Sequence, residues 1–419
     1  MFNLELTGIA SALRTWRGRV QSAGTGLTAA PIIDRCVATV AVVVTLSACS
    51  ASGPIHEPTP LQPIAAEQTV ERHWSSATAH GRLDAVYDRL EPIVADDVLY
   101  TARASGEVTA AALNNGKRQW RTKLDVTISG GVGLGAELVF VGTADAEVIA
   151  LDRKDGEPRW RVPVSSEVLV SPVATTGYVI VRCADGRVIA LNSATGQRLW
   201  LRHWPVPLLT LRGESRPVIV DDKVLVGLAD GRLVALDIFD GRTLWEAVVT
   251  APKGRTDLER MVDVDAAPLV ANGRVYVAAH QGRVVALELE TGRNLWSADV
   301  GSALGMVSDG AALYVVDDMD QVWALDLRSG RSLWKQDKLK HRRLSSPALI
   351  GDRVAVADFE GYTHWLASDD GRLVARYQIG GEEVEAIRVA PQVVGEIAYV
   401  RSEFGRIEAL GLRPAEEQR

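Results

Sequence analysis

The sequence is short of the residues from which most catalytic and metal centres are built. Its 419 residues include 3 cysteines and 7 histidines, and the histidines show none of the close pairings typical of zinc sites. It also has no nucleophile elbow, no phosphate-binding loop and no dinucleotide fingerprint. We therefore expect no catalytic residue, no cofactor and no metal site.

Positive charge is also in short supply. Lys and Arg number 46 against 53 Asp and Glu, so the formal net charge is −7 at pH 7. Nucleic acids attract proteins that carry extended basic patches, and this balance predicts no nucleic-acid partner. The one basic cluster, Lys335–Arg343, is compatible with a solvated joint or with a contact to anionic lipid or a partner.

The apolar run Cys36–Ala48 is too short to span a bilayer, which takes about 20 residues. It has the size of a signal-peptide core and follows Arg35. Its end, Leu-Ser-Ala followed by Cys49, resembles the lipobox of bacterial lipoproteins, in which the cysteine is acylated and becomes the mature N-terminus. We expect residues 1–48 to be a lipoprotein signal peptide with an over-long start; a chance apolar segment is the alternative.

The residues after Cys49 predict where the protein resides. Ser50 stands where an Asp would retain an enteric-type lipoprotein in the inner membrane, so we expect a lipid anchor on the periplasmic face of the outer membrane. Residues 49–66 comprise the lipidated cysteine and a Pro-rich tether, and 67–419 the folded domain. Cys183 is then the one cysteine left in that domain, which predicts a buried thiol and no intrachain disulfide.

Most of the chain consists of copies of one unit, best seen in Ser171–Trp200. In six copies a turn position lies fourteen residues before a Trp, as from Gly186 to Trp200, and in six a Pro lies fourteen residues before the turn. Length varies only between a Trp and the next Pro. Eight rigid units with a period near 43 residues indicate a repeat architecture.

Each unit predicts four short antiparallel strands. In Ser171–Trp200 we expect them over residues 172–175, 178–182, 187–191 and 197–200. The fold class is therefore all-β, an eight-bladed β-propeller of four-stranded blades, with a stacked solenoid as the alternative. We expect the Ala-Leu pair of the third strand to pack between blades and the Trp of the fourth strand to fill the outer interface. Asp320 for Gly and Ala375 for Trp are interpreted as drift.

The two ends of the repeat region complement each other. Val70–Ser75 presents a Trp without a preceding unit, and the last unit stops after its third strand, near Leu412. We expect Val70–Ser75 to be the fourth strand of the last blade, so that pairing of N- and C-terminal strands closes the ring.

The longest joints between units predict a binding surface. Trp200–Pro217 and Trp245–Pro268 are adjacent, and joints of this kind lie on the same face as the turns between second and third strands. The first joint contains leucines that a blade core does not need, and the second is rich in Asp and Glu.

The repeat resembles the propeller of pyrroloquinoline-quinone (PQQ) dehydrogenases. The lipoprotein signal, eight blades and two loops resemble the BamB family of outer-membrane assembly factors over roughly residues 70–412, most closely in LTLRGES (209–215) and DLERMVDVDAAP (257–268). The resemblance implies a non-enzymatic scaffold of the β-barrel assembly (BAM) complex that binds a POTRA domain of BamA and assists insertion of outer-membrane proteins. It also implies contacts with other BAM subunits and with unfolded outer-membrane proteins. The implied contact residues are Leu209, Leu211, Arg212, Asp263 and Asp265.

Two alternatives remain open. A PQQ-dependent periplasmic dehydrogenase would share the repeat, but such enzymes usually carry a vicinal cysteine pair and calcium ligands and are considerably longer, and no two cysteines are adjacent here. A generic propeller lipoprotein that acts as a sensor or binding module is the other alternative, because a propeller fold by itself does not define a function.

Overall fold

The computed structural model describes residues 56–77, 90–207, 215–251, 262–380 and 384–415. The chain divides into two units, 1–57 and 58–419, and the second contains every described strand. The predicted signal peptide and Cys49 lie outside the described residues. Within the described ranges no helix is long and apolar enough to cross a membrane.

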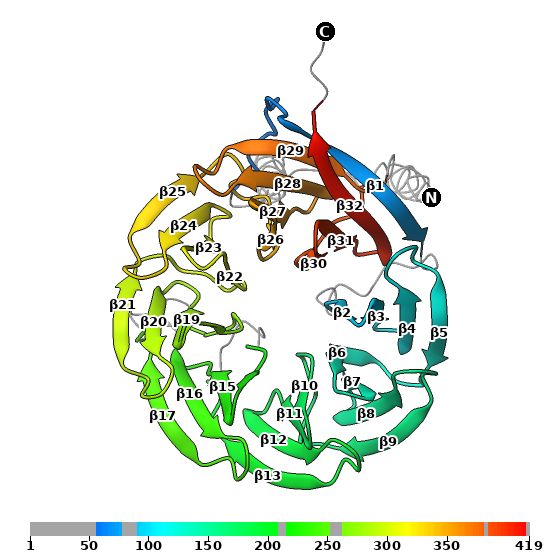
Figure 1. The fold of residues 1–419 in the computed structure, drawn as a ribbon. Helices are drawn as coiled ribbons and strands as arrows, with labels where there is room; N and C mark the ends of the chain where they lie inside the picture. Colours follow the sequence, from blue (N-terminus) through cyan, green and yellow to red (C-terminus); the bar gives the residue numbers. More distant parts are fainter. Residues whose placement is uncertain (1–55, 78–89, 208–214, 252–261, 381–383, 416–419) are drawn as a thin grey trace, which may run out of the picture. The chain divides into compact units, whose positions relative to one another are not determined.

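The second unit is an eight-bladed β-propeller, which confirms the predicted fold class (Figure 1). Each blade is a four-stranded antiparallel sheet whose first strand lies at the centre of the ring and whose fourth lies at the rim. The first four blades are β2–β5 (Ile93–Ala95, Val98–Ala102, Glu107–Ala112, Arg118–Lys123), β6–β9 (Ile128–Leu134, Leu138–Thr143, Glu147–Asp152, Pro158–Pro163), β10–β13 (Val173–Thr175, Tyr178–Arg182, Arg187–Asn192, Arg198–His203) and β14–β17 (Val218–Val220, Lys223–Gly227, Arg232–Asp237, Thr243–Val248). The next three are β18–β21 (Leu269–Ala271, Arg274–Ala278, Val284–Glu288, Asn294–Ala298), β22–β25 (Val307–Ser308, Ala312–Val316, Val322–Asp326, Ser332–Gln336) and β26–β29 (Ala348–Ile350, Arg353–Ala357, Tyr362–Ala367, Leu373–Gln378).

Blade 8 closes the ring with both ends of the repeat region. It consists of β30 (Gln392–Val394), β31 (Ile397–Arg401), β32 (Arg406–Pro414) and, as its fourth strand, β1 (Gln68–Ala77). β1 and β32 pair antiparallel from Gln68 opposite Pro414 to Ala77 opposite Arg406. The predicted closure is therefore confirmed, and it pairs the edge of the long strand β32 that would otherwise stand open.

The strand order gives the propeller two distinct faces. We call "joint face" the one that carries the turns between second and third strands, such as Asp185-Gly186, and the joints between blades. The opposite "turn face" carries the other two turns of each blade, such as Thr176-Gly177. The start of β1 at Gln68 and the end of β32 at Pro414 also lie on this face. The long joints predicted as a binding surface thus lie together on the joint face.

Neighbouring blades interlock through a tryptophan and a glycine. The Trp200 indole N–H donates to the Ile238 carbonyl of the next blade at 2.8 Å, and the ring lies against Gly241, where a Cβ would come within 2.6 Å of it. Gly241 has φ +71, which any other residue adopts only with strain. The same contact recurs at seven interfaces, Trp74 on Gly116, Trp120 on Gly156, Trp160 on Gly196, Trp200 on Gly241, Trp245 on Gly292, Trp296 on Gly330 and Trp334 on Gly371.

The residues before β1 lie along the rim of blade 7. This segment, residues 58–67, which we call the strap, starts at the joint face, where the Thr59 N–H donates to the Lys340 carbonyl at 3.0 Å. It ends at the turn face, where the Glu67 N–H donates to the Val374 carbonyl of β29 at 3.0 Å. Most of the strap was predicted as tether, and in the structure these residues contact the propeller.

Candidate partner-binding site

The two long joints meet at their bases on the joint face. Residues 204–207 and 215–217 of the first are described, as are 249–251 and 262–268 of the second. The predicted contact residues Leu209, Leu211 and Arg212 lie outside the described residues. The structure therefore describes the bases of the two loops.

Ser215 ties the two loops together and to the blades below them. Its hydroxyl donates to the Ala266 carbonyl of the second loop at 3.0 Å. The buried Arg182 guanidinium of β11 donates through Nη1 to the Ser215 carbonyl at 3.2 Å and to the Gly227 carbonyl at 2.6 Å. Charge-assisted bonds of this kind are among the stronger ones in proteins, so the loop bases are held in fixed positions.

Gly227 allows both loops to approach this closely. A Cβ at Gly227 would lie 2.5 Å from Val264 Cγ1, 2.7 Å from the Val264 carbonyl oxygen and 2.9 Å from Ser215 Cβ. Real side chains do not tolerate such distances, so the second strand of blade 4 must end in glycine for the loop bases to pack against it.

The structure places the two predicted acidic residues differently. The Asp263 side chain belongs to the buried interior at 1% exposure, whereas Asp265 is half-buried. The Asp263 carbonyl accepts the His280 N–H at 3.1 Å, which fixes the second loop to blade 5. Of the pair, Asp265 has the carboxylate that a partner could reach, and Asp263 is built into the base.

His280 is a titratable neighbour of this site that the sequence analysis did not single out. Its Nδ1 lies 2.9 Å from Asp318 Oδ1, and the same carboxylate accepts the Gln281 N–H at 2.8 Å. The hydrogen bond with Asp318 raises the pKa of His280, burial opposes it, and Asp265 and Asp263 add to the rise. A protonated His280 therefore offsets part of the acidic charge at the second loop. The available signal was a His at a position before the turn where four other copies have Ala.

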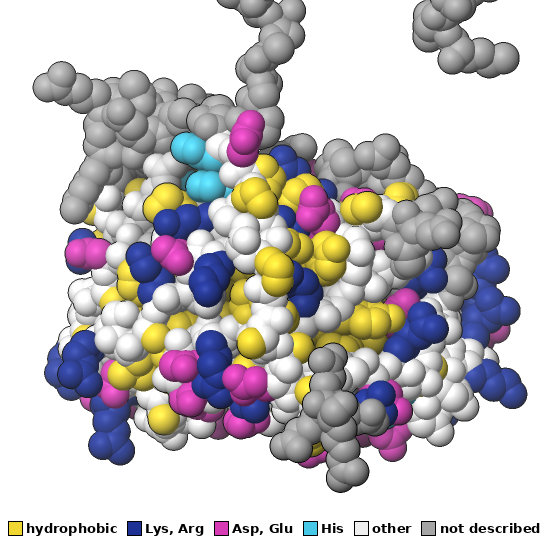
Figure 2. All heavy atoms as spheres, turned by 90° about the horizontal axis from the view of Figure 1, so that it is seen from above, with side chains coloured by type: hydrophobic (Ala, Val, Ile, Leu, Met, Phe, Trp, Pro, Cys, Tyr) yellow, Lys and Arg dark blue, Asp and Glu magenta, His cyan; other side chains and the backbone are white. Residues whose placement is uncertain are grey.

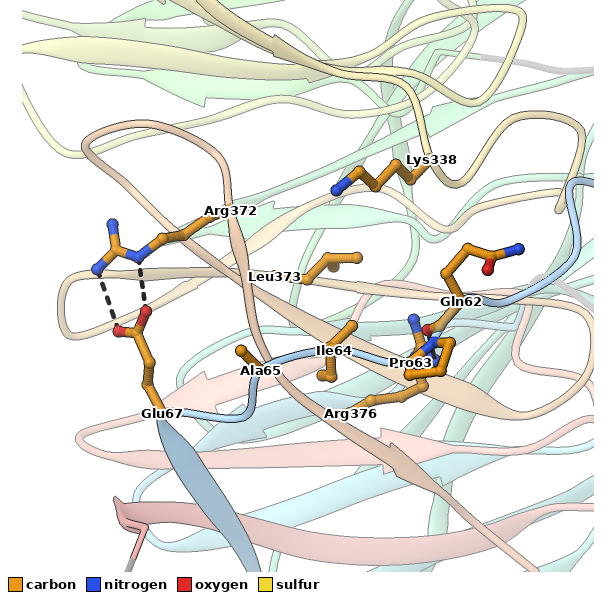
Figure 3. A pocket seen from close by; sticks show the side chains of 9 residues that line it. All are labelled: Gln62, Pro63, Ile64, Ala65, Glu67, Lys338, Arg372, Leu373 and Arg376. Carbon is orange, nitrogen blue, oxygen red and sulfur yellow. Dashed lines mark hydrogen bonds and ion pairs between the residues drawn. The ribbon is translucent and has the colours of Figure 1, made fainter. Parts of the chain in front are cut away.

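A cavity of about 240 Å³ lies on the rim, between the strap and blade 7 (Figure 3). Figure 3 shows the strap residue Glu67 joined to Arg372, with Nε–Oε1 2.8 Å and Nη2–Oε2 3.1 Å. Arg376 reaches across to the strap, because its Nη1 donates to the Gln62 carbonyl at 3.1 Å. The strap itself makes one wall of this cavity, so we regard it as part of the strap's attachment.

The basic joint Lys335–Arg343 has a structural role in holding the strap. Arg342, at 2% exposure, donates through Nη1 to the Thr59 carbonyl at 3.1 Å and through Nε to Asp358 Oδ2 at 2.7 Å. Its other terminal nitrogen pairs with Glu360. The centre of this cluster is thus a buried, paired charge rather than a solvated one.

On the rim near β29, β32 and β1, basic and acidic side chains are interspersed (Figure 2).

The described residues offer no group of three or more His, Cys, Asp or Glu side chains that could hold a metal ion. Cys183 is a free, fully buried thiol, as the sequence predicts, and burial raises its pKa. A buried thiol with a raised pKa is a poor nucleophile.

Fold and site together define an eight-bladed propeller in which the bases of two long joints lie side by side on one face. A family model described as outer membrane protein assembly factor BamB matches residues 104–336. BamB from Pseudomonas aeruginosa is 42% identical over 356 residues, which cover 85% of this chain and 93% of that protein. The chain belongs to the BamB family of outer-membrane protein assembly factors.

Two solved structures place the fold. BamB from Moraxella catarrhalis superposes with a TM-score of 0.72 at 27% identity, covering 80% of this chain and 99% of that chain. A quinohemoprotein alcohol dehydrogenase from Pseudomonas putida reaches a TM-score of 0.63 at 12% identity, over 84% of this chain and 77% of that one. The second likeness concerns the fold alone.

Proposed function

We propose that this protein is a non-enzymatic lipoprotein scaffold of the BAM complex that binds a POTRA domain of BamA through its two joint-face loops. In this role it assists the folding and insertion of outer-membrane proteins. The observation that carries the proposal is the bridge at the loop bases, where Ser215 joins Ala266 and Arg182 joins Ser215 and Gly227. Loops fixed at their bases on a closed ring lose little freedom on binding.

The roles of the contact residues follow from their chemistry. Leu209 and Leu211 are the apolar anchors and Arg212 is the charged contact, and arginine is one of the residues enriched among interface hot spots. Asp265 forms the acidic rim of the same surface. Asp263 acts by holding the second loop in place, because its side chain is buried in the free protein.

Lipidation of Cys49 would hold the protein at the periplasmic face of the outer membrane. Cys49 precedes Pro58, the start of the strap, by nine residues. An extended chain spans at most about 3.3–3.6 Å per residue, so the joint-face end of the strap stays within about 30 Å of the anchor. At this distance from the membrane the protein could also contact other BAM subunits and unfolded outer-membrane proteins.

The test is capture of BamA by the Leu211→Ala, Arg212→Ala double variant. We expect capture to be lost while the melting temperature stays near that of wild type, because each lost Leu contact costs roughly 1.5–3 kcal/mol of binding. Phe239→Ala is the matched control, since Phe239 is 63% exposed but lies on the turn face, and it should bind normally. A double variant that melts earlier yet binds BamA as well as wild type would mean that the leucines fold back onto the propeller.

The acidic half of the site is tested separately. Asp265→Ala should weaken BamA capture without a change in melting temperature. Asp263→Ala should lower the melting temperature as well, because truncating a fully buried side chain leaves a cavity at the loop base. Full binding by the variant that combines both substitutions would show that the second loop does not contribute to the surface.

A further inference from the structure

Blade 1 departs from the other seven blades on the face that it turns toward blade 8. Thr101 of β3 and Ala111 of β4 stand where every other blade has a Val and a Leu. The valines are Val141, Val181, Val226, Val277, Val315, Val356 and Val400. The leucines are Leu151, Leu191, Leu236, Leu287, Leu325, Leu366 and Leu410.

These smaller residues leave a cavity of about 190 Å³ between blade 8 and blade 1. At the interface between blades 3 and 4 the equivalent space is filled by Val226, Val234 and Leu236, which are fully buried. The cluster at the closing interface has only five buried members, among them Leu99 and Ile407. The cavity is lined by Trp74, Ser76, Leu99, Thr101, Glu107, Thr109, Ala111, Gly116, Arg118, Arg121 and Ile407.

The cavity has an apolar body and a basic edge. Trp74, Leu99 and Ile407 supply apolar walls, and Thr101 lies directly opposite Thr109, which places two hydroxyl-bearing side chains on one wall. On the rim strand β5, Arg121 lies opposite Thr109 and Arg118 opposite Ala111.

The charges at this edge do not cancel. Arg121 pairs with Glu107 at 2.5 Å, with Arg121 about half exposed. Arg118 adds a second positive charge on the exposed side of the lining. Two guanidinium groups face one carboxylate, so the edge carries a net positive charge that favours an anion.

We propose that this cavity binds a single aromatic ring that carries an anionic group, with the ring against Trp74 and the anion at Arg118 and Arg121. The size fits, because a cavity of about 150 Å³ accommodates benzene. Trp74 would then bind the aromatic ring of the ligand, and the two arginines would bind its anionic group.

Such a ligand would act on the closure of the ring. The cavity joins β1, which comes from the N-terminal end of the repeat region, to the first complete blade. A molecule that binds the folded ring and not the open chain stabilises the closed form, by an amount that grows with the logarithm of its concentration above Kd. The site lies at the interface of blades 8 and 1, whereas the two joint-face loops belong to blades 3 to 5, so it is independent of the proposed BamA surface.

The experiment is a titration of the full-length domain with phenylacetate, followed by the methyl resonance of Ile407 and by the melting temperature. We expect saturable shifts of that resonance and a higher melting temperature. Benzyl alcohol, which has the ring without the charge, should bind about tenfold more weakly, and phenethylamine, with the opposite charge, more weakly still. Absence of saturable binding by phenylacetate, or equal binding by all three, would overturn the proposal.

Two variants test the assignment to this cavity. Thr101→Val with Ala111→Leu restores the residues of the other blades, so it should raise the melting temperature of the free protein and abolish phenylacetate binding. Arg118→Gln should reduce phenylacetate affinity about tenfold while leaving benzyl alcohol unchanged. Val226→Thr with Leu236→Ala is the matched control at the interface of blades 3 and 4, and it should leave the Ile407 shifts intact. Binding that survives the filled cavity would place the ligand elsewhere and refute the site.

Discussion

Trp365 lies directly opposite Ala375 in blade 7, which reverses the order found in the other blades. Elsewhere an Ala of the third strand faces a Trp of the fourth, as Ala190 faces Trp200. The reversal has a physical reason. A Trp on the fourth strand packs on the glycine turn of the next blade, and blade 8 has no such turn because its third and fourth strands come from opposite ends of the chain. The interpretation of Ala375 as drift was therefore wrong.

Trp365 fills from the third strand the space that the other tryptophans fill from the fourth. It is fully buried, and no hydrogen-bond partner for its indole N–H is found among the described residues. Trp365→Ala should cost about 3–5 kcal/mol of unfolding free energy, measured by denaturant titration.

The phenylalanine variants separate packing from hydrogen bonding. Trp365→Phe should cost about 0.5–1.5 kcal/mol less than Trp334→Phe, because only Trp334 loses a hydrogen bond, the one to the Ser368 carbonyl at 2.8 Å. Equal losses would show that the Trp365 N–H has a partner in solution.

The buried charges behind the strap predict loss of stability in acid. His364 Nε2 donates to Asp358 at 2.9 Å, and His364 Nδ1 accepts from Arg376 Nε at 3.2 Å, so the ring is neutral. Burial lowers the pKa of His364 below its ordinary 6.5, against the opposing effect of Asp358. The unfolded chain therefore takes up a proton below pH 6.5 that the folded chain refuses, and the free energy of unfolding should fall by up to about 1.4 kcal/mol per pH unit below that value.

Asp358 extends the same trend to lower pH. Burial would raise its pKa, but the hydrogen bond from His364 and the Arg342 guanidinium outweigh burial and hold the pKa below its ordinary 3.8. Its contribution is present above pH 3.8 and is lost as the pH falls through the folded value. His364→Gln, which keeps one donor and one acceptor, should flatten the decline between pH 6.5 and 5. An unchanged pH profile in this variant would contradict the assignment.

Ring closure predicts unequal effects for two adjacent segments. Deleting residues 67–75 removes most of β1 and should lower the melting temperature sharply. Replacing residues 58–66 by a Gly/Ser sequence of the same length keeps β1 and removes the side chains of the strap, so it should cause a smaller decrease. Scanning calorimetry of both variants measures the difference, and equal melting temperatures for wild type and the deletion would rule out closure in solution.

Lipidation at Cys49 predicts the location of the protein. Cys49→Ala should move it from the membrane fraction to the soluble periplasmic fraction, since several acyl chains anchor a protein firmly and none is then attached. Fractionation followed by immunoblotting measures this. Retention of the variant in membranes would count against the lipobox.

The absence of enzymatic activity is also testable. Adding PQQ and calcium should cause no shift in melting temperature, and dye-linked oxidation of alcohols or sugars should stay at background. A thermal shift that saturates with PQQ would favour the dehydrogenase alternative.

The regular spacing within each repeat unit is the reason that the strands and the joints could be predicted from the sequence. The strand expected over 178–182 is β11, because a β-branched run between two glycine turns leaves few other conformations. The positions of the long joints follow from the fixed length of the units between them. The structure of the joint bases cannot be predicted in this way. The burial of Asp263 and the pairing of His280 with Asp318 depend on how neighbouring blades approach each other.

The sequence analysis also missed the role of Asp320 and the cavity beside Thr101, because both depend on contacts between parts of the chain that lie in different blades. Asp320 looked like a lost glycine, yet its carboxylate accepts the backbone N–H groups of Arg343 and Leu344, each at 2.8 Å. The cavity beside Thr101 becomes visible in the sequence only once the register of all eight blades is known. Contacts across blades decide each of these positions, and spacing along one unit does not carry that information.

The strap also determines how the propeller bears mechanical load. In a protein held by its N-terminal end, tension would reach the ring through residues 58–67. Because the strap is bonded to the propeller at Thr59, Gln62 and Glu67, a pull from the N-terminal side must break these bonds before it reaches β1. The pairing of β1 with β32 is therefore loaded only after the strap has been released.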